Sequence, residues 1–283
     1  MTKSIYVSSL AFLGMNEEEI ISIAIENNLA IEFSSGLKYR PDMEEMYLNA
    51  AIKRMPHNYF PAPEVPFVLN LASENKGIRE LSIRHCINGL KLAKYARSPF
   101  FAAHAGFCVD PSAVELGKKI TIRKDYNKIK NREIFLESIS KILSVANDLN
   151  IDFLIENNVL AAFNFENGSN PLLCCESSEI AWLFDSIKDH RLGLLLDTAH
   201  LKVSCKTLNL DLKEELMSII PYIKGLHHSD NDGEKDDNNP ISEEYWFLDY
   251  MKLFLNLPHV LEVKSIAIND IKAQLKILQS LWN

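Results

Sequence analysis

The sequence lacks the cysteine pattern of a disulfide framework or a structural zinc site. It contains five cysteines, an odd number, without Cys-x-x-Cys spacing, and two of them, Cys174 and Cys175, are adjacent. Disulfide-rich secreted folds and zinc ribbons both need regularly spaced pairs of cysteines. We therefore expect reduced thiols, and we predict a cytoplasmic location.

Long apolar runs and an excess of positive charge are also missing. No stretch approaches the roughly 18 consecutive apolar residues that span a bilayer, and the first residues form no continuous apolar signal region. The formal net charge is -8, from 30 Lys and Arg against 38 Asp and Glu. Because nucleic-acid binding usually depends on clustered basic residues, the sequence favours neither a membrane nor a nucleic-acid partner.

Short apolar segments alternate with amphipathic helical sequence along the whole chain. Eight such units in about 250 to 300 residues are typical of a (β/α)8 barrel, whereas a doubly wound sheet usually shows a Gly-rich turn after its first strand. That turn is absent, and no Pro/Gly/Ser-rich linker divides the chain. We predict an α/β fold, a (β/α)8 TIM barrel, with residues 1–283 as a single domain. The predicted strands cover residues 5–10, 29–33, 67–71, 99–104, 151–156, 192–197, 223–228 and 259–263.

Ionisable residues stand where several of these strands end. Glu156, Asp197 and His227 close three strands, His104 closes another, and Glu262 interrupts an otherwise apolar one. The ends of parallel barrel strands converge, so these side chains should meet at the carboxyl-terminal face. Three carboxylates buried together need a cation or shared protons, and the pattern therefore predicts a divalent metal site. The alternative interpretations are salt bridges with Lys or Arg and, for Asp197 by itself, a helix cap.

Three loops are longer than usual and belong to the same rim of the predicted barrel. They cover residues 105–132, 157–175 and 229–243, and loops of this length in a compact domain tend to be functional. We expect them to enclose one site. Arg123, Lys124 and Arg132, in or beside the first of these loops, could hold a phosphate group, or they could simply be solvated.

Seven short motifs follow one another in a specific order and spacing. Together they resemble the xylose isomerase-like barrel superfamily, which contains sugar isomerases and epimerases, inosose dehydratase and the endonuclease IV group. The resemblance spans nearly the whole chain and depends on Ile-Glu-Phe at 31–33, Asn-Leu-Ala at 70–72, His-Ala-Gly at 104–106, Ile-Glu-Asn-Asn at 155–158, Leu-Asp-Thr-Ala-His at 196–200, His-His-Ser-Asp-Asn-Asp-Gly at 227–233 and Leu-Glu-Val at 261–263.

The resemblance implies one divalent metal ion held by Glu156, Asp197, His227 and Glu262. An oxygen-rich set with one imidazole favours Mn²⁺, Mg²⁺ or Co²⁺, and Zn²⁺ also fits. In the isomerase branch, Glu156 and Glu262 also form the catalytic acid/base pair that makes and reprotonates an enediolate. We therefore predict a metal-dependent isomerase or epimerase of a small keto sugar, polyol derivative or sugar phosphate.

Five further residues are candidates for contact with this carbohydrate substrate. His200 matches a position that contacts substrate oxygens in the isomerases and binds metal in the endonucleases. Lys235 is the cation nearest to where several epimerases place an arginine, and a solvated lysine is its alternative. The complete candidate set is His200, His104, Asp230, Lys235 and Trp246. The oligomeric state is left open.

Three other functions are compatible with the same motifs: an inosose dehydratase-like lyase, an endonuclease IV-like zinc phosphodiesterase, and a non-catalytic sugar-binding barrel. Two departures argue against the phosphodiesterase. Residues 64–67, Glu-Val-Pro-Phe, stand where the family often shows His-Ala-Pro-Phe, and Asn238 stands where a zinc-binding Asp-x-His motif would place histidine. On this interpretation His57 is a surface or packing residue. Glu32 could be either a substrate contact or a core salt bridge.

Overall fold

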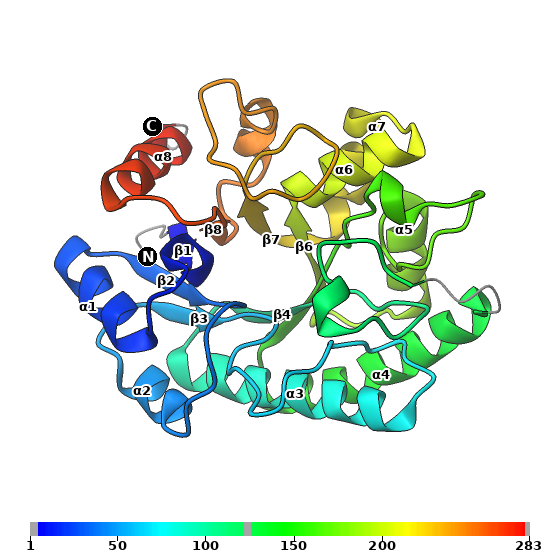
Figure 1. The fold of residues 1–283 in the computed structure, drawn as a ribbon, viewed down its shortest axis with the longest axis horizontal. Helices are drawn as coiled ribbons and strands as arrows, with labels where there is room; N and C mark the ends of the chain where they lie inside the picture. The colour runs from blue at the N-terminus through cyan, green and yellow to red at the C-terminus, as the bar shows by residue number, and fades with distance from the viewer. Residues whose placement is uncertain (1–4, 122–125, 281–283) are drawn as a thin grey trace.

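The computed structural model describes residues 5–121 and 126–280. Within these residues, eight parallel strands form one sheet in the order β3-β2-β1-β8-β7-β6-β5-β4, curled into a nearly closed barrel (Figure 1). The predicted TIM-barrel fold is thereby confirmed. The strands are β1 (Ile5–Ser8), β2 (Ala30–Phe33), β3 (Arg54–Pro56), β4 (Phe100–His104), β5 (Asp152–Glu156), β6 (Leu192–Asp197), β7 (Ile223–His228) and β8 (His259–Leu261).

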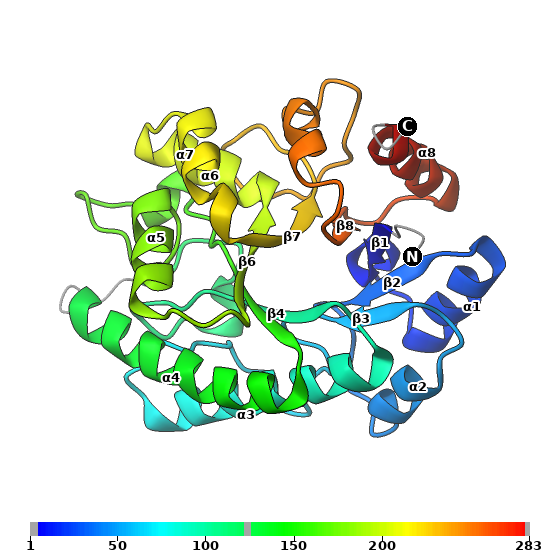
Figure 2. The same ribbon diagram turned by 180° about the vertical axis from the view of Figure 1, so that it is seen from behind.

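Helices surround this barrel, as both views show (Figure 1, Figure 2). The connection from β7 to β8 contains a 3-10 helix, η5 (Leu248–Leu253), where the other crossovers contain α-helices. No helix of the described part of the chain is both long and apolar enough to cross a bilayer. The α-helices are α1 (Glu17–Asn27), α2 (Met43–Asn49), α3 (Lys76–Ala96), α4 (Lys128–Leu149), α5 (Ser177–Ser186), α6 (Thr198–Leu208), α7 (Leu212–Ile219) and α8 (Ile268–Ser280).

The third strand is not where the sequence predicted it. Residues 67–71 form no strand, although Val68, Leu69 and Leu71 are buried. Two backbone amides of this segment bond to side chains instead of a neighbouring strand: the Leu69 amide to the Tyr59 hydroxyl at 2.9 Å, and the Asn70 amide to the Ser82 hydroxyl at 3.0 Å. The third strand is the three-residue β3, and the residue that follows it is His57.

The barrel closes where β3 meets β4. A single parallel bridge joins His57 to Ala102, and the Asn58 amide donates to the Ala102 carbonyl at 2.8 Å. Below this seam the interior is filled by one apolar cluster, Met55, Phe100, Ala102, Leu154, Leu195 and Val260. Gly225 in β7 leaves room for Phe100, because a Cβ at Gly225 would lie 2.7 Å from the phenyl ring.

Candidate metal centre

The candidate site is a ring of polar side chains directly above the apolar cluster of the barrel. Successive residues of a strand point to opposite faces, so a residue two positions after an inward apolar side chain also points inward. Five strands repeat this step: Met55 to His57, Ala102 to His104, Leu154 to Glu156, Leu195 to Asp197 and Val260 to Glu262. The alternation of the strands therefore converts residues far apart in sequence into one layer.

Four members of this layer form a carboxylate-rich ligand set. Glu156, Asp197, His227 and Glu262 each offer a ligand atom, and these atoms lie within 4.8 Å of one another. His227 Nδ1 lies 3.0 Å from a Glu262 oxygen and 3.5 Å from a Glu156 oxygen. All four residues are buried. The structure thus brings together the four residues that the sequence predicted as metal ligands.

A second, histidine-rich set adjoins the first and shares Glu156 with it. His57, His104 and Glu156 also offer atoms within 4.8 Å of one another. The Glu156 Oε2 atom lies 3.2 Å from His57 Nε2 and 3.0 Å from His104 Nε2. The sequence interpretation had placed His57 on the surface or in packing. The sequence misses His57 because it predicts the third strand at residues 67–71, whereas β3 ends at Pro56. The histidine at the end of the third strand, which residues 64–67 lack, is therefore His57.

His200 lies beside the carboxylate-rich set with one ring nitrogen directed toward it. Its Nδ1 donates to the Asn157 carbonyl at 2.8 Å, which leaves Nε2 facing Asp236 at 3.3 Å and Asp197 at 3.9 Å. Asp197 itself has two functions. One oxygen caps α6 by accepting from the His200 amide at 2.7 Å, while the other has no hydrogen-bond partner. The helix cap and the metal ligand are therefore compatible interpretations of Asp197.

The ligand atoms suit a cation because several of them are buried without hydrogen bonds. Glu156 Oε1, Asp197 Oδ2 and Asp236 Oδ1 are buried and lack hydrogen-bond partners, and Glu156 Oε2 has only the imidazoles of His57 and His104 beside it. A carboxylate removed from water without hydrogen bonds costs several kcal/mol unless a positive charge compensates it. Nitrogen and carboxylate donors at these spacings fit divalent transition metals. The residues present thus fit the metal that the chemistry implies.

Burial and mutual charge set the protonation of these groups when no cation is bound. Burial raises the pKa of Asp197 to about 7, and the nearby carboxylates contribute in the same direction. Glu156 behaves differently, because the adjacent imidazoles of His104 and His57 outweigh its burial and lower its pKa. Burial opposes a charged His227, yet the carboxylates of Glu32 and Glu262 raise its pKa. Charge in the ring is thus balanced between acids and imidazoles.

The remaining predicted substrate contacts, Asp230, Lys235 and Trp246, interact with neighbouring side chains and not with the ring. Asp230 forms an ion pair with Lys202 at 2.7 Å, and Lys235 forms an exposed pair with Asp237 at 3.0 Å. Trp246 packs on Phe247, with ring centroids 5.3 Å apart, and its indole nitrogen is buried without a partner.

Of the three basic residues considered for phosphate binding, only Arg132 can be placed. It pairs with the buried Glu179 at 2.8 Å and lies over the Trp182 ring. The other two, Arg123 and Lys124, lie outside the described residues.

His228 points away from the ring, as strand alternation predicts, and belongs to a buried hydrogen-bond chain. His259 Nε2 lies 3.1 Å from the Phe254 carbonyl, which can only accept, so His259 Nδ1 must accept from His228 at 2.9 Å. Burial, with His259 and His227 nearby, lowers the pKa of His228 well below its usual value, and its Nδ1 accepts from Tyr245 at 3.1 Å. This chain attaches the loop after β7 to the strand that carries His227.

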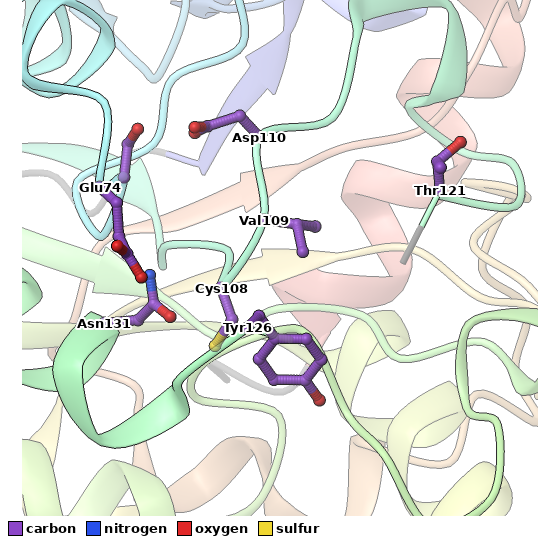
Figure 3. A pocket seen from close by; sticks show the side chains of 8 residues that line it. Glu74, Cys108, Val109, Asp110, Thr121, Tyr126 and Asn131 are labelled. Atoms are coloured by element: carbon purple, nitrogen blue, oxygen red, sulfur yellow. The ribbon is translucent and has the colours of Figure 1, made fainter. Parts of the chain in front are cut away.

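A separate cavity of about 310 Å³ lies among the loops that follow β3 and β4 and the first turn of α4 (Figure 3). None of the ligand residues lines it. The candidate metal-binding residues therefore lie outside this cavity. The cavity is lined by Ser73, Glu74, Cys108, Val109, Asp110, Thr121, Tyr126 and Asn131.

Comparison with known proteins agrees with this architecture. The chain is 25% identical over 234 residues to "Probable endonuclease 4" of a Sulfurihydrogenibium species, covering 76% of this chain and 75% of the relative. A D-tagatose 3-epimerase-like protein has the same fold, with a TM-score of 0.74 and 19% identity over 99% of this chain and 97% of that one. A Thermus thermophilus protein soaked with zinc chloride gives a TM-score of 0.64 and 18% identity, over 98% and 97% of the two chains.

The likeness to these solved structures shows the fold alone, whereas a family profile covers most of the sequence. The profile described as "Xylose isomerase-like TIM barrel" matches residues 36–261. The matched region contains β3 to β8 and therefore every ligand of the two metal sets except Glu262, which follows its last residue. The chain therefore belongs to the xylose isomerase-like TIM-barrel family.

Proposed function

We propose that this protein is a metal-dependent phosphodiester hydrolase whose centre takes two divalent ions. The observation that carries the proposal is Glu156, which belongs at once to a carboxylate-rich and to a histidine-rich ligand set. Two-metal centres of this kind are typical of phosphatases and nucleases. A one-ion isomerase would leave the histidine-rich set of His57, His104 and Glu156 without a metal ion. The curated relative named "Probable endonuclease 4" supports the same choice.

The ring assigns roles to its own side chains. His57 and His104 would hold one ion, Asp197, His227 and Glu262 the other, and Glu156 both. Ions bound there would supply Lewis acidity toward a phosphoryl oxygen. The side chains of His104 and Asp236 are 35% and 23% exposed, whereas those of Glu156 and His227 are fully buried, so substrate reaches the ring from the side of His104 and Asp236.

Hydrolysis also requires a proton to move. The attacking water loses a proton as its oxygen forms a bond to phosphorus, the bond to the leaving oxygen breaks, and the proton is passed on to that oxygen. Asp236 is placed for this transfer, because its Oδ1 atom has no hydrogen-bond partner and its carboxylate lies beside His200 at the mouth of the site. Asp236 lies two residues before Asn238, at the aspartate position of the Asp-x-His motif considered in the sequence.

The surface charge restricts the class of phosphodiester. Lys202 and Lys206 of α6 and Lys235 of the loop after β7 each form an ion pair with an acidic residue of that loop. On this side of the described structure, phosphate recognition would therefore depend on the ring and not on these lysines. This favours a small or locally exposed phosphodiester over an extended duplex.

The second candidate is the isomerase or epimerase of a small sugar predicted from the sequence. It is favoured by the carboxylate-rich set, in which Glu156 and Glu262 both approach His227 Nδ1, at 3.5 and 3.0 Å. In this reaction one glutamate would take a proton from the carbon beside the substrate carbonyl and the other would return one. Dehydration through the same enolate is a branch of this candidate.

Metal content and two substrates separate these candidates. The hydrolase should retain two ions per chain after dialysis and cleave bis(p-nitrophenyl) phosphate or a strand containing an abasic site. His57→Gln should remove one ion and most of that cleavage, whereas His190→Gln, at an exposed position, should change neither. One ion per chain, together with solvent-deuterium exchange into a ketose that survives His57→Gln, would establish the isomerase instead.

A further inference from the structure

Glu32 is a buried carboxylate that neither candidate reaction uses. It lies in β2 and is completely inaccessible to solvent. Its Oε2 atom is 3.0 Å from His227 Nε2. The opposite ring nitrogen of His227, Nδ1, faces the ligand oxygens of Glu262 and Glu156. Glu32 therefore contacts the one side of this imidazole that is turned away from the candidate ions.

This contact determines which nitrogen of His227 can bind a cation. A neutral imidazole carries one hydrogen, and only the other nitrogen offers a lone pair. Without a cation, both ring nitrogens face carboxylates at 3.0 Å, Nε2 that of Glu32 and Nδ1 that of Glu262, and both contacts favour an N–H. A cation held by Glu156 and Glu262 would displace the hydrogen from Nδ1, whereas the hydrogen bond to Glu32 would keep the hydrogen on Nε2. Metal-binding histidines almost always donate their second nitrogen in this manner, which fixes the tautomer and the ring orientation.

Glu32 also lies close to His57, a member of the histidine-rich ligand set. Glu32, His57 and His227 each offer an atom within 4.8 Å of the other two, and the two imidazole rings meet edge to face at 4.8 Å. The Oε1 atom of Glu32 and the Nδ1 atom of His57 are both buried without hydrogen-bond partners. His57 Nε2 meanwhile faces Glu156. Glu32 is thus close to one histidine of each set, and its hydrogen bond is to His227.

We propose that Glu32 is a positioning residue for the metal centre: it holds His227 with Nδ1 toward the candidate ions. The proposal rests on the metal binding inferred under the proposed function, and it applies to either candidate reaction. It also decides between the two interpretations of Glu32 that the sequence left open. Because Glu32 is fully buried behind His227, it does not contact substrate.

Metal affinity tests the proposal without any substrate. Glu32→Met keeps the approximate size of the side chain but removes the acceptor, whereas Glu32→Gln keeps an oxygen that can accept from Nε2. Zinc affinity, measured by competition with a chromophoric chelator, should fall about 100-fold in Glu32→Met and about tenfold in Glu32→Gln. Glu179→Gln is the matched control: it alters another fully buried, ion-paired glutamate outside the ligand sets, and affinity should stay at the wild-type value.

A spectroscopic signature separates positioning from a general loss of stability. In protein labelled with ¹⁵N-histidine and loaded with ¹¹³Cd, His227 should show cadmium coupling at Nδ1 and a hydrogen on Nε2. Glu32→Met should weaken or remove that coupling. If Glu32→Met does not fold, the tenfold loss expected for Glu32→Gln decides the question.

Two outcomes have different meanings. Wild-type affinity and an unchanged His227 spectrum in the Glu32 variants would overturn the proposal while leaving the metal centre intact. If the wild-type protein binds no zinc or cadmium above a dialysis blank, the proposed function itself fails and the role of Glu32 fails with it.

Discussion

Zinc should raise the melting temperature of this protein by one increment for each of the two ligand sets that it occupies. An ion that binds only the folded state contributes about 2.7 kcal/mol when its free concentration is about 100 times its Kd. In chains of roughly this size, 1 kcal/mol shifts Tm by about 2–4 °C. Each occupied set should therefore raise Tm by roughly 5–11 °C, and two occupied sets by up to about twice as much.

Substitutions can remove the two increments in Tm separately or together, because only Glu156 belongs to both sets. His57→Gln alters only the histidine-rich set and should keep one increment. Glu262→Gln alters only the carboxylate-rich set and should keep the other. Glu156→Gln alters both, so its Tm should respond to zinc weakly or not at all. Before zinc is added, the variants should remain folded, since each glutamine is close in size to the residue it replaces.

The measurement is differential scanning fluorimetry on protein stripped with a chelator and then titrated with zinc, accompanied by metal analysis after dialysis. His190→Gln serves as the control and should show the full wild-type shift, because its side chain is 75% exposed. The reasoning would be refuted if Glu156→Gln retained as large a zinc-dependent shift as His57→Gln. That result would mean that the two sets do not share a ligand.

Three further predictions concern residues that position the ring or support the fold. Asp197→Asn should leave the metal-free Tm nearly unchanged, because asparagine caps helices as well as aspartate does, but it should release metal during dialysis. Gly225→Ala should cost about 1–3 kcal/mol in urea unfolding, since its Cβ would lie 2.7 Å from the Phe100 ring. Glu179→Ala should cost about 3–5 kcal/mol, because it leaves the partly buried Arg132 and Lys128 without their shared carboxylate, and zinc affinity should stay constant.

Each of these predictions has a contrary result. Full metal retention by Asp197→Asn would show that its unpartnered oxygen is not a ligand. An unchanged urea midpoint for Gly225→Ala would mean that Phe100 can move aside at no cost. A loss of zinc affinity in Glu179→Ala would show that the ion pairs between α4 and α5 affect the metal-binding ring, although none of the ring residues takes part in them.

The sequence was sufficient to predict the barrel and the grouping of four candidate ligands, because both follow from strand alternation. Glu156, Asp197, His227 and Glu262 each occupy an inward position at the end of a strand, which a two-residue period reveals. Asp197 was also correctly considered as a helix cap. What the sequence could not show is that one oxygen of Asp197 caps the helix while the other is left without a hydrogen bond, since that depends on the direction of the side chain.

The third strand could not be recognised from hydrophobicity, and His57 was missed with it. β3 has three residues and includes a proline, whereas residues 67–71 are a longer apolar run that is buried in loop packing. The useful signal would have been a histidine directly after Met-Pro, between the second and fourth strands. Asn238 has a local explanation: its φ of +47° is the left-handed conformation that asparagine tolerates well.

The single bridge between β3 and β4 links assembly of the ring to completion of the barrel. His57 belongs to that bridge, and its candidate partners His104 and Glu156 stand on the far side of the seam. An ion held by these three residues would act as a cross-link across the weakest join of the sheet. Amide hydrogen exchange at Asn58, whose N–H crosses the seam to Ala102, would therefore slow when metal binds.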